Sequence, residues 1–76
     1  MEYYFLGLEA NLRDDNRYDD LDKATEKAAW ISSKRRVPVR IYKMWPNKKY
    51  SHARTIAPAD ALNILKDYEE VKERVN

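Results

Sequence analysis

With 76 residues, the chain is long enough for one small domain, which we expect to span residues 1–76. It has no cysteine and a single histidine, His52, so disulfides and thiolate metal sites are excluded, and we expect a cytoplasmic protein without a metal or cofactor. Fifteen Lys and Arg stand against 13 Asp and Glu, and the resulting net charge of +2 indicates no class of partner by itself.

The first predicted element is a strand at residues 2–10, EYYFLGLEA, which is rich in aromatic and aliphatic residues. Both of its faces are mostly apolar, so we expect an inner strand or one that is covered on both sides. A polar loop follows, and Asp19 or Asp20 is a candidate N-cap for the next helix. The acidic residues here are Asp14, Asp15, Asp19, Asp20 and Asp22. They lack the spacing and the central glycine of a calcium loop, so we predict no metal site.

The segment LDKATEKAAWISSK, residues 21–34, predicts a helix with one apolar stripe. The stripe consists of Leu21, Ala24, Ala28 and Ile31. Trp30 lies on nearly the opposite side of this helix. Two interpretations of Trp30 remain open: another segment covers its ring, or the ring is an exposed anchor for a partner.

Residues 37–57 predict a β-hairpin in which the strands VPVRIYKMW and YSHARTIA are joined by the turn signal PNKK. The predicted register pairs Val39 with Ile56, Ile41 with Arg54, Lys43 with His52 and Trp45 with Tyr50. Arginine is an awkward residue for a core face, so we expect the far end of the hairpin to project past the core into solvent.

Positive charge is concentrated on and just before this hairpin. Residues 34–54 hold eight Lys or Arg and no acidic residue, whereas the rest of the chain holds seven basic and 13 acidic residues, a net charge of −6. This distribution predicts a basic ridge and an acidic opposite pole. The alternative is that the charges only protect an edge strand from aggregation, for which one or two would be enough. The predicted binding surface comprises Arg35, Arg36, Arg40, Tyr42, Lys43, Trp45, Lys48, Lys49, Tyr50 and Arg54, together with Trp30.

The tail PADALNILKDYEEVKERV, residues 58–75, predicts an amphipathic helix with Pro58 at its first position. Its apolar face requires a surface to pack against. That surface is either the sheet of the same molecule or the same helix of a second copy, so a homodimer through this helix remains an alternative.

The order β-α-β-β-α predicts an α+β fold with a three-stranded mixed sheet and two helices packed on it. A right-handed crossover through the first helix would place the first two strands parallel. The sheet face without helices would then present Tyr3, Phe5, Arg40, Tyr42 and Met44. Such an apolar and partly basic patch is too large to leave unused.

Catalytic chemistry finds little support in the sequence. Gly7 is the only glycine, which excludes a glycine-rich phosphate loop. Ser51 and His52 are neighbours in a predicted strand, so their side chains point to opposite faces and cannot form a nucleophile–base pair. We therefore expect no enzymatic activity.

Two classes of binding function remain open. In the first, the basic residues of 34–54 contact the phosphates of a nucleic acid, and Tyr42, Trp45 and Tyr50 stack on its bases. In the second, the same surface is steered to an acidic protein, with Trp30, Trp45 or Tyr42 as anchors. The acidic pole could equally meet a basic protein.

The stretch LDKATEKAAWISSKRRVPVRIYKM resembles the helix-then-strand pattern of many small bacteriophage accessory proteins, in which an alanine-containing helix precedes a strand of the type "pV.iyk". The resemblance covers about a third of the chain and carries over no functional residue. It implies a small phage protein in the host cytoplasm that binds a host or defence protein complex, such as RNA polymerase, a nuclease or a CRISPR effector, and inhibits or redirects it. We expect a non-enzymatic protein of this kind, with nucleic-acid binding by the hairpin 34–54 as the alternative.

Overall fold

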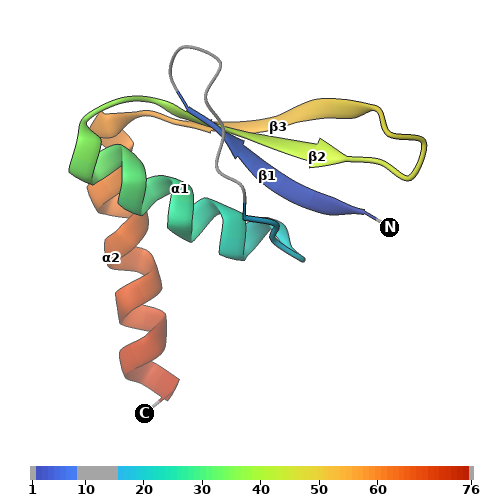
Figure 1. Cartoon of the computed structure of the whole chain (residues 1–76). Helices are drawn as coiled ribbons and strands as arrows, with labels where there is room; N and C mark the ends of the chain where they lie inside the picture. Colours follow the sequence, from blue (N-terminus) through green and yellow to red (C-terminus); the bar gives the residue numbers. More distant parts are fainter. Residues whose placement is uncertain (1, 9–15, 76) are drawn as a thin grey trace.

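The computed structural model describes residues 2–8 and 16–75, with side chains placed through Tyr68. Its elements are β1 (Tyr3–Gly7), α1 (Leu21–Arg35), β2 (Val39–Met44), β3 (Tyr50–Ile56) and α2 (Pro58–Val75). The strands form one layer, and both helices lie on the same side of it (Figure 1). Part of the acidic cluster, Asp14 and Asp15, lies outside the described residues.

The sheet has the strand order β1-β2-β3 and is antiparallel throughout, so the predicted mixed sheet is wrong. The reason lies in the chain just before α1. Tyr18 exchanges two backbone hydrogen bonds with Tyr4, at 2.8 and 2.9 Å, so the chain has already returned to the start of β1 before the helix begins. α1 then runs along the sheet in the direction of β1, and β2 has to come back antiparallel (Figure 1).

α1 begins and ends at identifiable caps. The Asp20 side chain accepts a hydrogen bond from the backbone N–H of Lys23 at 2.8 Å, which confirms one of the two candidate N-caps. At the other end, Arg36 adopts the left-handed conformation (φ 58°) and donates its N–H to the carbonyl of Ser32 at 2.8 Å. These two caps therefore define where α1 begins and where it ends.

The core lies between α1 and the sheet, and the small side chains of α1 let the helix approach closely. Its buried members are Leu6, Val39, Ile41 and Ile56 from the strands, Ala24, Ala28, Ala29 and Ile31 from α1, and Ala61 from α2. Three of the four predicted stripe residues of α1 belong to this core, whereas Leu21 is exposed.

α2 packs chiefly against α1, not on the sheet, which corrects the prediction that both helices cover the sheet. A three-stranded sheet is roughly 10–15 Å wide and a helix with its side chains about 10 Å, so α1 alone fills this face. Ala61, Ile64 and Leu65 of α2 are buried or partly buried against the core within the same chain. The homodimer through residues 58–75 stays a prediction.

A tyrosine joins α2 to the first turn of α1. Tyr68 Oη donates to Asp22 Oδ1 at 3.5 Å. Burial, and after it the neighbouring Asp22 carboxylate, raises the pKa of Tyr68. The phenol therefore stays protonated at neutral pH and remains a hydrogen-bond donor to Asp22.

Removal of either of two buried hydroxyl groups of α1 should change the stability of the fold, but in opposite directions. Ser32 Oγ donates to the Val37 carbonyl at 2.6 Å, whereas Thr25 Oγ1 is buried and has no hydrogen-bond partner in the described part of the chain. We expect Thr25→Val to raise the free energy of unfolding by about 1 kcal/mol, because valine keeps the shape and removes the unsatisfied hydroxyl. We expect Ser32→Ala to lower it by about 1–2 kcal/mol. Urea denaturation followed by circular dichroism measures both, and a destabilised Thr25→Val variant would contradict the assignment.

Candidate functional site

β2 and β3 form the predicted hairpin, but the register changes half-way along it. The predicted pairs Val39–Ile56 and Ile41–Arg54 are confirmed. Beyond Ile41 the register shifts by one residue, which makes Ala53 an extra residue of β3, a β-bulge. The structure pairs Tyr42 with His52, Lys43 with Ser51 and Met44 with Tyr50, so the predicted pairs Lys43–His52 and Trp45–Tyr50 are wrong.

The bulge decides which side chains share a face. Side chains alternate along a strand, so a shift of one residue moves all those beyond it to the other side of the sheet. Tyr50 and His52 would have lain beside Lys43 on the helix side. With the bulge at Ala53 they lie beside Tyr42, on the side without helices.

This helix-free side of the sheet carries a contiguous set of rings. We call Tyr3, Phe5, Tyr42, Tyr50 and His52 the open-face cluster. Phe5 is its centre: the Tyr42 ring stacks on it at 5.3 Å between centroids, and the Tyr50 ring meets it edge-on at 5.6 Å. Tyr42 also meets Tyr50 edge-on at 5.6 Å and His52 at 5.9 Å. Phe5 is only 7% exposed, whereas Tyr50 is 62% exposed. The central side chain of the cluster is therefore buried, and Tyr50 at its margin is accessible to solvent.

The sequence prediction that Tyr3, Phe5, Arg40, Tyr42 and Met44 share this side is confirmed by the β1–β2 register. Neither helix covers this side of the sheet in the described part of the chain (Figure 1). The patch therefore exists as predicted and is extended by β3.

The only glycine explains how the rings fit. A Cβ atom at Gly7 would lie 2.7 Å from Cε2 of Tyr42, which is closer than real Cβ contacts. The Tyr42 ring therefore lies so close over Gly7 that any side chain at this position would force the ring to move. This contact gives Gly7 a packing role that the sequence did not reveal.

The Gly7 contact predicts a double-mutant cycle. We expect Gly7→Ala to lower the free energy of unfolding by roughly 1–2 kcal/mol, because the methyl group has to displace the Tyr42 ring. In a Tyr42→Ala background the same substitution should cost nothing, since the ring is gone. Thermal unfolding of the four proteins measures the coupling, and equal effects of Gly7→Ala in both backgrounds would contradict the contact.

Two arginines border the open-face cluster. The Arg17 guanidinium carbon lies 4.6 Å from the centroid of the Tyr3 ring, and Arg40 Nη2 donates to the Leu8 carbonyl at 3.1 Å. His52 Nε2 lies 2.7 Å from the Thr55 hydroxyl. The cluster thus combines exposed ring surface with positive charge at its margin.

Lys43 and Trp45 belong to a different side of the molecule. Lys43 Nζ lies 4.2 Å from the centroid of the Trp45 ring and 3.4 Å from Glu2 Oε2. The Trp45 indole N–H donates to Ser51 Oγ at 3.1 Å. These contacts lie on the helix side of the sheet, since Lys43 alternates with Tyr42 along β2. A carboxylate of the chain itself already contacts Lys43.

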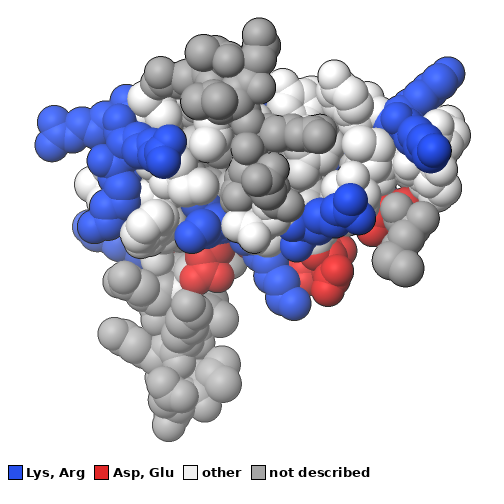
Figure 2. Space-filling view, in the orientation of Figure 1, with Lys and Arg blue, Asp and Glu red and all other residues white. Residues whose placement is uncertain are grey.

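The remaining predicted basic residues are divided among separate places. Arg35 and Arg36 end α1, Lys48 and Lys49 lie in the hairpin turn, and Arg54 is close enough to Tyr68 of α2 to affect its pKa. Figure 2 shows Lys and Arg gathered at both ends of the sheet, over the α1–β2 turn and over the β2–β3 turn. Of the predicted site, Arg40, Tyr42 and Tyr50 lie on the side without helices, whereas Lys43 and Trp45 contact each other on the helix side. The basic residues therefore do not form one continuous ridge.

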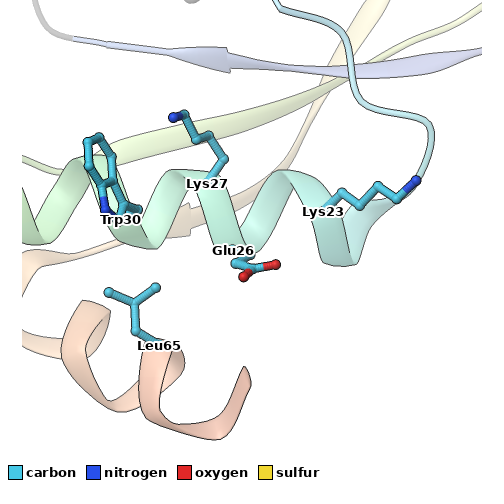
Figure 3. A pocket seen from close by; sticks show the side chains of 5 residues that line it. All are labelled: Lys23, Glu26, Lys27, Trp30 and Leu65. Atoms are coloured by element: carbon cyan, nitrogen blue, oxygen red, sulfur yellow. The ribbon is translucent and has the colours of Figure 1, made fainter. Parts of the chain in front are cut away.

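Trp30 is 47% exposed and lines a pocket of about 310 Å³ between α1 and α2. The other lining residues are Lys23, Glu26, Lys27 and Leu65. Figure 3 shows the Leu65 side chain pointing from α2 toward α1, which carries Trp30, and Lys27 Nζ lies 4.5 Å from the centroid of the Trp30 ring. The ring is therefore partly covered, as one interpretation expected, and partly exposed, as the other expected.

Other chemistry is not evident in the described part of the chain. No group of three or more His, Asp or Glu among those residues could hold a metal ion, and none of the described helices is long and apolar enough to cross a membrane.

No protein-family model matches the chain, and searches of curated proteins and of solved structures found no match.

Proposed function

We propose that this is a non-enzymatic binding protein whose open-face cluster stacks on the bases of single-stranded nucleic acid. The observation that carries the proposal is the arrangement of the rings: several aromatic side chains share a helix-free sheet face, and the outermost, Tyr50, is 62% exposed. Bases stack on such rings with about 1–3 kcal/mol each, whatever their sequence. One common class of RNA-binding domain uses aromatic residues on a four-stranded sheet to stack two or three bases.

The charges around the cluster support a polyanionic ligand. Arg17 and Arg40 border the rings, and further Lys and Arg lie at both ends of the sheet (Figure 2). Among the described carboxylates, Glu2 contacts Lys43 on the helix side, Asp20 caps α1, and most of the others belong to the two helices. Phosphates on either side of the stacked bases would meet these cations.

A titration of a labelled single-stranded oligonucleotide, of about ten nucleotides, tests the proposal. We expect binding of both DNA and RNA single strands at low salt, and weaker binding of a duplex whose bases cannot stack on the rings. With about three phosphate contacts, the logarithm of the affinity should fall with the logarithm of the salt concentration with a slope of roughly −2. Absence of binding to either single strand at low salt would contradict the proposal.

A protein partner is the second candidate function, and the half-exposed Trp30 is the observation that favours it. Tryptophan is enriched among the residues that dominate protein interfaces, and Trp30 lies in a pocket with an apolar wall at Leu65. The resemblance to phage accessory proteins would make this partner a host or defence complex in the host cytoplasm. Trp30→Ala should then abolish a specific complex that Trp45→Ala leaves intact.

A further inference from the structure

β3 is an edge strand whose outer side is unpaired in the described part of the chain. Its residues from Tyr50 to Thr55 are all exposed. On such an edge, alternate residues turn their N–H and C=O groups away from the sheet, where another strand can pair with them. The opposite edge of the sheet differs, because Tyr4 of β1 already bonds to Tyr18 through both backbone groups.

The bulge restricts which part of this edge can pair. Ala53 interrupts the ladder, and a bulge bends the strand that contains it. The stretch from Tyr50 to His52, between the bulge and the hairpin turn, keeps a regular register with β2. A partner strand would therefore be short.

Charge limits the identity of that partner. Lys48 and Lys49 precede the free edge and Arg54 follows the bulge, whereas residues 31–59 contain no carboxylate. A second copy of this chain would bring the same cations against one another, and such like-charge pairing is how proteins keep edge strands apart. An acidic segment would instead be attracted, because its carboxylates would pair with these cations.

We infer that the β3 edge at Tyr50–His52 accepts an extended, acidic segment of a partner protein as a fourth strand. Main-chain hydrogen bonds would supply the pairing, and Lys48, Lys49 and Arg54 would select negative charge. The inference concerns the backbone edge of β3, not the ring faces. It therefore does not depend on the nucleic-acid proposal.

The probe is a capped peptide of about six residues that alternates Glu with Val or Thr, added to the full chain. We expect it to slow amide hydrogen exchange of the outward-facing amides within Tyr50–His52 at least several-fold and to shift the NMR signals of the same amides. Two matched peptides are controls: one with Lys in place of Glu, and one with the same sequence but with methylated backbone nitrogens at alternate residues. Neither should bind at the concentration at which the first peptide is half-bound.

The variant Lys48→Glu/Lys49→Glu should weaken binding of the acidic peptide about tenfold and let the lysine peptide bind. Equal binding of the methylated and unmethylated peptides would overturn the inference, because the contact would then be charge attraction without strand pairing. Protection located outside β3, or no binding of the acidic peptide, would overturn it as well. Oligonucleotide binding is measured separately, so either proposal can fail alone.

Discussion

Leu6→Ala is expected to lower the free energy of unfolding by about 3 kcal/mol, the largest loss of stability that we predict from a single substitution. Leu6 is fully buried in the second half of β1, where it pairs with Ile41 and belongs to the core shared with α1. Most residues that α1 contributes to this core are alanines, so the strands supply most of its large side chains. The short alanine side chains of α1 cannot extend into the cavity that Leu6→Ala leaves.

Leu62→Ala is the matched control, because it removes the same atoms from a leucine of α2 that is 63% exposed. We expect this substitution to change the free energy of unfolding by less than about 0.5 kcal/mol. Urea denaturation of the two variants measures the difference. The comparison holds when the free energy of unfolding falls with urea concentration at the same slope in both. Similar losses in both would show that the core does not lie between α1 and the sheet.

The second large effect concerns binding. Replacing Tyr42 and Tyr50 together by Ala should weaken binding of a single-stranded oligonucleotide by roughly 100-fold, because two stacking surfaces of about 1–3 kcal/mol each are lost. Tyr50→Ala alone should account for about tenfold, with little change in thermal stability, since the Tyr50 side chain is largely exposed. Fluorescence anisotropy at one fixed salt concentration gives both values.

Trp30→Ala is the control for this series, because it removes an exposed aromatic ring that lies on α1 and not on the sheet face. Its affinity for the oligonucleotide should equal that of the unchanged protein. A loss in Trp30→Ala comparable to the loss in the double tyrosine variant would place the contact on the helix side. Unchanged affinity in the tyrosine variants would remove the stacking role of the cluster.

The elements of this fold could be predicted from the sequence because each has a local signal. Apolar residues at helical spacing mark α1 and α2, Asp20 marks the beginning of α1, and the turn signal PNKK marks the hairpin. The relative direction of β1 and β2 has no such signal. It depends on where the chain runs before α1, and the Tyr4–Tyr18 bridge that fixes this forms only in three dimensions.

The composition of the site was harder to predict than the fold. Eight basic residues within 21 positions suggested one surface, yet strand alternation and the two ends of the sheet separate them. The bulge at Ala53 also has no sequence signal, and without it His52 and Tyr50 are assigned to the wrong side. Arg17 and Gly7 were missed because their roles depend on contacts with Tyr3 and Tyr42.

NMR titration of the isotope-labelled chain with a single-stranded oligonucleotide tests the central claim most directly. Binding through the rings predicts that the largest shifts occur at the open-face cluster and at Gly7 beneath Tyr42, while the signals of α2 stay in place. Shifts confined to the two basic turns at the ends of the sheet would instead show contact by charge alone, and would contradict binding by stacking.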